Sequence, residues 1–209
     1  MTSARITEGL SAAGLFAGPW FTLVYVVEGA RRKDYSALRH PVSSLALGEH
    51  GWRQAVNFLS TGALMVAYGV GVQRSESGAR WLPRLIGSVG VGLLGAGVFA
   101  TDPLSGYPPG TLAVPARPTP KGVLHVLFSA LVFLGLPAAF IVDARTADRG
   151  WARYSKATCL GFAGTFLVAR AGFGQAPRLV GVAGLFQRLA LSIGFAWVSA
   201  RALRSLRLS

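Results

Sequence analysis

The sequence predicts an all-α, polytopic membrane protein: a bundle of six transmembrane helices that forms one domain, residues 1–209. The composition carries this prediction, because 52% of the residues are hydrophobic and only 14% are charged, which is too apolar for a soluble domain of this length. The apolar residues also lie in long continuous runs. Such runs are typical of membrane helices, whereas membrane β-barrels show short alternating segments.

Six runs approach the length of about 20 apolar residues that crosses a bilayer as a helix. The first one continues into further spans without a clear small-residue cleavage site, which indicates a retained helix rather than a signal peptide. In the third run small residues recur every fourth position, a pattern that predicts close packing against a neighbouring helix. These residues are Ser88, Gly92, Ala96 and Ala100. We expect the helices at about 10–29, 53–73, 82–101, 122–142, 158–174 and 179–203.

The distribution of Lys and Arg among the loops predicts the orientation of the chain. Basic residues are more frequent in the loops on the side of the two termini, which favours both termini in the cytoplasm. A basic cluster after the first helix weakens this bias. The richness in Ala, Gly, Val, Leu and Arg is typical of bacteria with GC-rich genomes, so we expect a multi-pass protein of the bacterial inner membrane.

The formal net charge of +13 is explained by these loop residues, which anchor the helices and meet the headgroups of membrane lipids. Nucleic acid is not an expected partner, because no basic stripe is interleaved with exposed aromatic residues. Self-association into a homo-oligomer is an open alternative. The single cysteine, Cys159, excludes an intramolecular disulfide and a cysteine metal cluster.

The two long loops on the predicted outer side are the first candidates for a functional feature. The first spans residues 30–52, and the second, residues 101–122, contains six prolines. Loops of this length are uncommon unless they are functional or disordered, and dense proline excludes helix. We expect a lid or vestibule over the outer face, with an ordinary hydrophilic loop as the alternative.

Isolated polar residues at the outer ends of the apolar runs are the candidate site. Asn57 shares one helix face with Gln54 and Thr61, and a helix–helix hydrogen bond is the alternative to a functional role. His125 lies between Lys121 and Ser129 on a polar stripe and can transfer protons near neutral pH. The inner halves of the helices are almost free of charge. We therefore expect the ends that carry Glu28, His40, Asn57, Asp102, His125, Arg170 and Arg188 to form one site.

Three charged residues have specific expected partners. Asp102 precedes Pro103 at the outer end of the third helix, where an apolar surface would favour the protonated carboxyl and make it a candidate general acid. Arg170 and Arg188 are expected to pair with Asp102 or Glu28, or to hold an anionic headgroup. Arg188 lies too deep to be explained simply by its side chain reaching back to the membrane surface.

The order and spacing of several short motifs resemble a family of bacterial and archaeal membrane proteins, the domain of unknown function 998 family. The resemblance covers nearly the whole chain and implies a six-helix bundle with paired roles for His40 and His125, but it implies no settled activity. From this family and from the polar ends, we take Ser43, Ser44, Trp52 and Gln187 as further binding residues. The motifs are His40 to Leu45, Gly51-Trp52, Asn57-Phe58, Gly62, Thr101 to Pro103, Gly122 to His125 and Gly184 to Arg188.

Acid–base groups above an apolar bundle predict an enzyme that acts on a lipid-like or isoprenoid small molecule. The most concrete version is a proton-initiated terpene or meroterpenoid cyclase, with Asp102 as the acid and His125 as its partner or base. In that version aromatic residues stabilise cationic intermediates through cation–π contacts. The candidates for that role are Trp20, Phe99 and Trp197.

Other functions are open as well. A hydrolase or headgroup transferase would use Ser43 or Ser44 activated by a histidine. A transporter or lipid-binding protein would use the same groups without catalysis. A metal or haem protein would use His40, His50 and His125, but no HxxxH or HExxH spacing supports it, and we expect no cofactor and no bound metal.

Overall fold

The computed structural model describes residues 3–76, 78 and 80–208. These residues form six α-helices, one short 3₁₀ helix and no β-strand, apart from an isolated bridge between Leu104 and Tyr107. The predicted all-α fold is therefore confirmed. The elements are α1 (Ser3–Arg31), η1 (Val42–Ala46), α2 (Gly51–Ser75), α3 (Leu82–Val98), α4 (Pro120–Thr146), α5 (Arg149–Phe173) and α6 (Ala183–Leu208).

Each helix of the structure overlaps one of the predicted ranges and differs from it near the ends. The largest difference is in α5, which begins at Arg149 and not near residue 158. Its start is set by Asp148, whose carboxylate accepts the backbone N–H groups of Gly150 at 2.9 Å and Trp151 at 3.0 Å. An N-cap of this kind satisfies N–H groups that have no partner within the helix.

Among the described residues four helices, α1, α2, α4 and α6, are long and apolar enough to cross a membrane. The other two differ for separate reasons. α3 is apolar but has only 17 residues, about 25 Å at 1.5 Å per residue. α5 has 25 residues but carries Arg149, Arg153 and Lys156 in its first turns. The chain thus has the features of a multi-pass membrane protein.

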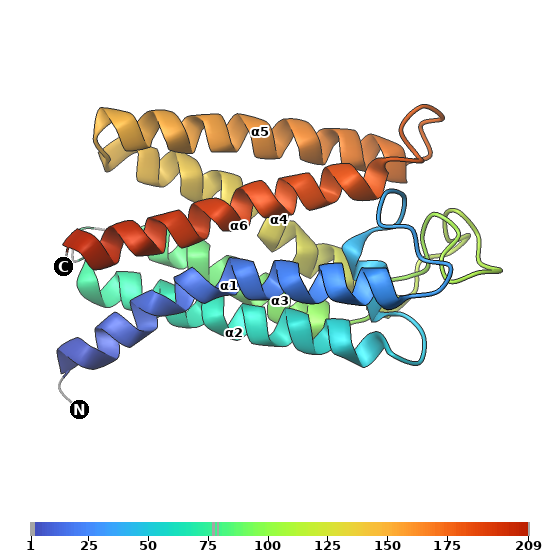
Figure 1. The fold of residues 1–209 in the computed structure, drawn as a ribbon, viewed down its shortest axis with the longest axis horizontal. Helices are drawn as coiled ribbons and strands as arrows, with labels where there is room; N and C mark the ends of the chain where they lie inside the picture. The colour runs from blue at the N-terminus through green and yellow to red at the C-terminus, as the bar shows by residue number, and fades with distance from the viewer. Residues whose placement is uncertain (1–2, 77, 79, 209) are drawn as a thin grey trace.

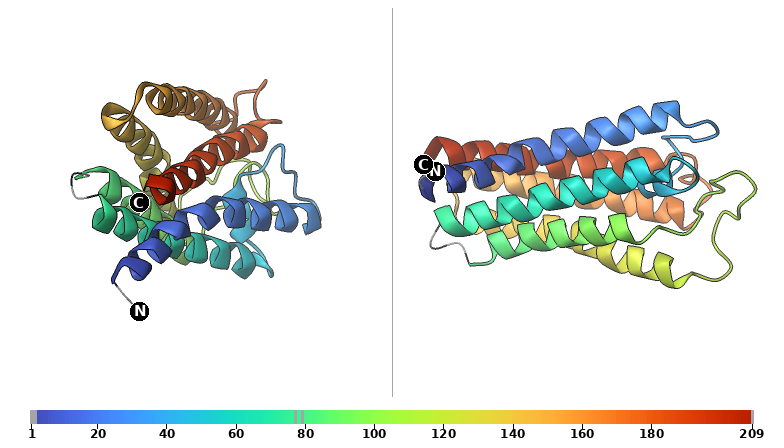
Figure 2. Two further views of the ribbon diagram at one scale, coloured as in Figure 1. Left: turned by 60° about the vertical axis from the view of Figure 1, so that its left-hand side comes forward. Right: turned by 90° about the horizontal axis from the view of Figure 1, so that it is seen from below.

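All six helices run along the long axis of the molecule (Figure 1). The first and last described residues lie at the same end, where short connections join α2 to α3 and α4 to α5. The connections 32–50, 99–119 and 174–182 gather at the opposite end (Figures 1 and 2). We call these the short-loop end and the long-loop end. Both loops of the predicted lid or vestibule lie at the long-loop end (Figure 1).

The interior is filled by aromatic and small residues from different helices. The Phe21 ring on α1 lies 5.8 Å from that of Phe58 on α2 and 5.1 Å from that of Phe195 on α6, measured between centroids. Aromatic pairs at such distances add packing energy beyond the area that they bury. This cluster joins α1, α2 and α6 beneath the long-loop end.

The small-residue stripe of α3 packs against α4, as predicted. A Cβ atom on Gly92 would lie 2.6 Å from the Phe128 carbonyl oxygen, and Ser88 Oγ would lie 3.3 Å from a Cβ on Gly135. Ala96 is buried in the same face, whereas Ala100 lies beyond the helix end and is exposed. The close approach of the two backbones therefore depends on the absence of a side chain at position 92.

The Gly92 contact can be tested with a matched glycine on the same helix. Gly92→Ala places a methyl group against the backbone of α4, so we expect it to lower the free energy of unfolding by about 1–3 kcal/mol. Gly87→Ala has open space and is expected to be neutral or stabilising by up to about 1 kcal/mol. Denaturant unfolding in detergent micelles measures both. Equal stability of the two variants would contradict the packing.

Candidate functional site

The connection between α1 and α2, residues 32–50, folds inward over the bundle; we call it the entry loop. Arg32 binds the C-terminal part of this loop. Its two terminal nitrogens donate to the carbonyl oxygens of Leu45 at 2.9 Å and Leu47 at 3.0 Å. Val42, Ser44 and Leu45 in η1 are buried. The entry loop is thus partly buried and held by side-chain hydrogen bonds, unlike an ordinary hydrophilic surface loop.

Arg188 on α6 binds the N-terminal part of the entry loop. Its Nη1 atom donates to the carbonyl oxygens of Ala37 at 2.6 Å and His40 at 3.0 Å, and its Nη2 atom donates to the Tyr35 hydroxyl. The guanidinium also lies over the ring of Tyr25, with its Cζ atom 5.7 Å from the centroid. The five donors of arginine in a fixed fork suit such a set of acceptors.

The expected pairing of Arg188 with Asp102 or Glu28 is wrong. No carboxylate lies within 4 Å of Arg188 in the described part of the chain. Glu28 instead faces Arg53 at 3.3 Å and Arg32 at 3.9 Å. The sequence could not show this, because the carbonyl groups that replace a carboxylate become available only when the entry loop folds.

His40 is buried between two aromatic rings. The centroid of its imidazole lies 5.4 Å from that of Tyr35 and 5.1 Å from that of Tyr107, and its Nδ1 atom accepts the backbone N–H of Ser36 at 2.9 Å. Burial lowers the pKa of His40, and the positive charge of Arg39 lowers it further. His40 is therefore neutral near pH 7, with its proton on Nε2.

Asp102 joins the second long loop to the start of α4. Its carboxylate accepts the backbone N–H of Thr119 at 2.9 Å and the Thr119 hydroxyl at 2.7 Å. A Cβ on Gly122 would lie 2.1 Å from Asp102 Oδ2, so glycine leaves the space for the carboxylate. A negative charge is favourable at a helix N-terminus. The role of Asp102 as a general acid stays a prediction.

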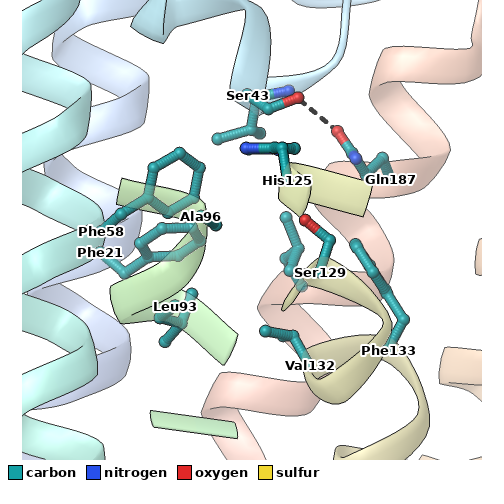
Figure 3. Close-up of a pocket in the computed structure, with 12 residues that line it drawn as sticks. Phe21, Ser43, Phe58, Leu93, Ala96, His125, Ser129, Val132, Phe133 and Gln187 are labelled. Carbon is teal, nitrogen blue, oxygen red and sulfur yellow. Dashed lines mark hydrogen bonds between the residues drawn. The ribbon is translucent and has the colours of Figure 1, made fainter. Parts of the chain in front are cut away.

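A small cavity below the entry loop brings several predicted residues together. Figure 3 shows Ser43, His125 and Gln187 around its upper part, with Ser129 one helical turn below His125. Its volume is about 40 Å³, enough for about three water molecules. The cavity therefore has a polar upper end and apolar walls. The apolar lining residues are Phe21, Val42, Phe58, Leu93, Ala96, Val132, Phe133 and Leu191.

Gln187 and His125 are both oriented by backbone groups. Gln187 Oε1 accepts the backbone N–H of Val42 at 2.9 Å, which connects α6 to the entry loop. His125 Nδ1 lies 2.8 Å from the carbonyl oxygen of Phe99. A carbonyl oxygen can only accept, so Nδ1 carries a proton and the neutral imidazole has its lone pair on Nε2. Nε2 is then the basic atom of the ring.

Other predicted residues support the site or lie outside it. The Asn57 side-chain nitrogen donates to the Phe21 carbonyl oxygen at 3.1 Å, which makes it a link between α2 and α1. The Ser44 hydroxyl is buried without a partner in the described structure. Trp52 is 61% exposed, with the guanidinium of Arg53 over its ring. Arg170 is exposed on α5. Neither Trp52 nor Arg170 lines the cavity.

The two histidines with proposed paired roles lie in different surroundings. His40 contacts Tyr35 and Tyr107, whereas His125 contacts Phe58 and lines the cavity. Within the described residues no group of three or more His, Cys, Asp and Glu side chains is placed to hold a metal ion. The geometry thus offers nothing in favour of the metal alternative.

A buried charged cluster at the short-loop end was not predicted from the sequence, which indicated inner halves almost free of charge. Arg201 on α6 donates to Asp143 on α4 at 2.8 Å and to Glu76 after α2 at 2.8 Å. Trp151 Nε1 donates to the other Asp143 oxygen at 2.6 Å. The only signal in the sequence was an acidic residue, Asp143, directly after a long apolar run. This cluster joins α4, α5, α6 and the end of α2.

Comparison with known protein families agrees with this picture. The family model described as "Protein of unknown function (DUF998)" matches residues 15–204. The chain belongs to this family. No curated protein and no solved structure matches the chain. Membership in DUF998 confirms the resemblance inferred from the motifs. Three motif glycines, Gly51, Gly122 and Gly184, lie where a Cβ would meet an atom of a loop at 2.5 Å or less.

The lowered pKa of His40 makes the stability of this DUF998 protein depend on pH. A histidine in the unfolded chain has a pKa of about 6.5, above the lowered pKa of His40 in the folded protein. Between these two pKa values the unfolded chain binds more protons than the folded one. The free energy of unfolding therefore decreases as the pH falls through this window. We expect wild type to lose more thermal stability than His40→Asn between about pH 7 and pH 5. The asparagine oxygen can accept the Ser36 N–H in place of Nδ1.

His50 provides the control for this experiment, because it is exposed. His50→Asn should keep the wild-type dependence on pH. The measurement is the fraction of monodisperse protein after heating, followed by size-exclusion chromatography in detergent at each pH. Identical slopes for wild type and His40→Asn would refute the role of His40.

Proposed function

We propose that the protein is an integral membrane enzyme that transfers a proton to or from a lipid-like or isoprenoid substrate, with His125 as the acid–base group. The observation that supports this most directly is the position of His125 at the polar end of an apolar cavity. Its Nδ1 atom is held by the Phe99 carbonyl oxygen at 2.8 Å. This contact leaves Nε2 as the ring atom that can accept a proton.

The shape of the cavity fits the polar end of an amphiphile better than a whole lipid. A volume of about 40 Å³ holds a hydroxyl or a similar group, but not a hydrocarbon tail. The lining residues Ser129 and Phe133 come from α4, and Leu191 comes from α6. A tail would therefore leave between these two helices. Ser43 and Gln187 would then contact the polar group from the entry-loop side.

The cyclase version of this proposal needs aromatic rings next to the reacting carbons. The rings named from the sequence lie elsewhere: Trp20 is exposed and donates to Ser60 at 2.7 Å, Trp197 donates to Ser155 at 2.9 Å, and Phe99 stacks on Phe128. Phe21, Phe58 and Phe133 line the cavity instead. Those three are the residues that would stabilise a cation in a cyclase.

A lipid-binding protein or transporter is the second candidate. It is favoured by the fact that the Nδ1 hydrogen bond of His125 is to a backbone carbonyl group and not to a carboxylate or a serine. A catalytic histidine is usually oriented by a further polar side chain. Ser43, the hydrolase candidate, lines the same cavity, but no hydrogen bond joins it to His125 in the described structure.

Deuterium exchange tests the proposal with a mixture of candidate substrates. Purified protein is incubated with a membrane lipid extract or a polyprenol panel in deuterated buffer, and the lipids are analysed by mass spectrometry. We expect wild type to produce a lipid with deuterium on carbon, and His125→Ala to reduce the rate by about 10²–10⁴, the usual contribution of general acid–base catalysis. His50→Ala is the matched control and should keep the rate.

The outcomes separate the candidate functions. Exchange that persists in His125→Ala would refute the acid–base role of His125. A lipid that co-purifies with wild type and with the variant, without any exchange in either, would favour the binding protein or transporter.

We also propose that all six helices cross a bacterial inner membrane with both termini in the cytoplasm. The higher content of Arg and Lys at the short-loop end supports this orientation. In a Cys159→Ser background, Leu112→Cys in the long loop is expected to react with a membrane-impermeant maleimide on intact cells. Arg149→Cys at the opposite end should react only after permeabilisation. The reverse pattern would invert the orientation.

A further inference from the structure

A groove at the short-loop end, far along the helices from the entry loop, carries a second candidate site. It lies between the residues that lead into α3 and the last turns of α4, and its volume is about 510 Å³. Arg80, Trp81 and Leu82 line one side, and Val142 and Arg145 line the other. The groove thus combines two guanidinium groups with an apolar floor.

The two arginines of the groove differ from the buried arginine beside it. Arg201 forms ion pairs with Glu76 and Asp143, each with a nitrogen–oxygen distance of 2.8 Å. Arg80 and Arg145 are exposed, and neither has a carboxylate within 4 Å among the described residues. Glu76 and Asp143 both line the groove and share one guanidinium, that of Arg201, and neither is paired with Arg80 or Arg145. The positive charges of Arg80 and Arg145 remain available for a ligand.

Trp81 indicates the level of the groove in the membrane. The tryptophan is 57% exposed, and the Cζ atoms of Arg80 and Arg84 each lie 5.6 Å from the centroid of its ring. The next residue, Leu82, is buried in the bundle. Tryptophan and arginine side by side at the end of an apolar helix are typical of the headgroup region of a bilayer.

The backbone at the start of α3 adds a further attraction for an anion. Trp81, the N-cap residue, makes no side-chain hydrogen bond to the first turn of the helix. Pro83 in this turn has no N–H group, but the N–H groups of Leu82 and Arg84 have no partner within the helix, and the helix dipole places partial positive charge there. The positive end of the α3 dipole therefore lies at the groove, whose lining includes Leu82.

We propose that this groove binds an anionic phospholipid, with its phosphate held by Arg80 and Arg145 and its glycerol and upper acyl chains against Leu82 and Val142. Guanidinium groups bind phosphate oxygens through paired hydrogen bonds. The volume suits a headgroup, unlike the 40 Å³ cavity at the other end. The lipid site is independent of the proposed catalytic function and of the direction in which the chain crosses the membrane.

Native mass spectrometry of the purified protein in detergent tests this site, with phosphatidylglycerol as the probe and phosphatidylcholine as the zwitterionic comparison. We expect Arg80→Gln/Arg145→Gln to bind phosphatidylglycerol at least about tenfold more weakly, because hydrogen bonds to charged groups are lost. The matched control is Arg149→Gln/Arg153→Gln, which removes two exposed arginines at the same end but outside the groove. It should change binding less than about twofold if the groove is specific.

Each other outcome would overturn the proposal. An equal loss in both double variants would mean attraction by overall charge, and unchanged binding in both would mean that the groove is not the site. Equal retention of phosphatidylcholine would exclude selection of an anionic headgroup. Displacement of the lipid by soluble glycerol phosphate would identify a free phosphate compound as the ligand. Size-exclusion profiles of the variants confirm that the lipid is tested on folded protein.

Discussion

The architecture of the long-loop end depends on the contact between one turn of α6 and the backbone of the entry loop. Burying a loop leaves its carbonyl and N–H groups without water, and each needs a partner inside the protein. Arg188 donates hydrogen bonds to the carbonyl oxygens of Ala37 and His40, and the adjacent Gln187 accepts one from the backbone N–H of Val42. Gly184 permits the approach, because a Cβ there would lie 2.5 Å from the His40 carbonyl oxygen. The position of Ser43 at the cavity follows from these contacts.

Arg188 and Arg201, near the two ends of α6, are held by different kinds of interaction. At the long-loop end a cation is satisfied by backbone oxygens and aromatic rings, whereas at the short-loop end Arg201 is satisfied by Asp143 and Glu76. Removing one member of a buried ion pair leaves an unmatched charge, which is strongly destabilising. The carboxylates of this cluster hold α4 and the end of α2 to α6. The exposed Arg80 and Arg145 at the same end are not part of this cluster.

How much of the structure could be predicted depends on the range of the interaction. Hydropathy is local, so the six helices and the two long loops were predictable, and the grouping of His125, Ser43 and Gln187 followed from their helix ends and motifs. Partners that meet only after folding were not. The pairing of Arg188 was missed because its acceptors are carbonyl groups of a distant loop. The Arg201 cluster was missed because Arg201 and Asp143 lie 58 positions apart and each resembles an ordinary charge at a helix end.

The chemistry available at His125 is set by where α3 ends. The helix stops at Val98, and Phe99 adopts an extended backbone with φ −101° and ψ 111°. The carbonyl groups of the last helical turn lack partners within the helix, and the extended Phe99 turns its own carbonyl oxygen to His125 Nδ1. A helix that continued to residue 101, as hydropathy predicted, would hold Phe99 in helical backbone geometry and turn its carbonyl group along the helix axis instead. The shortness of α3 is therefore the feature that fixes the imidazole through Nδ1 and leaves Nε2 as the unprotonated nitrogen of the neutral ring.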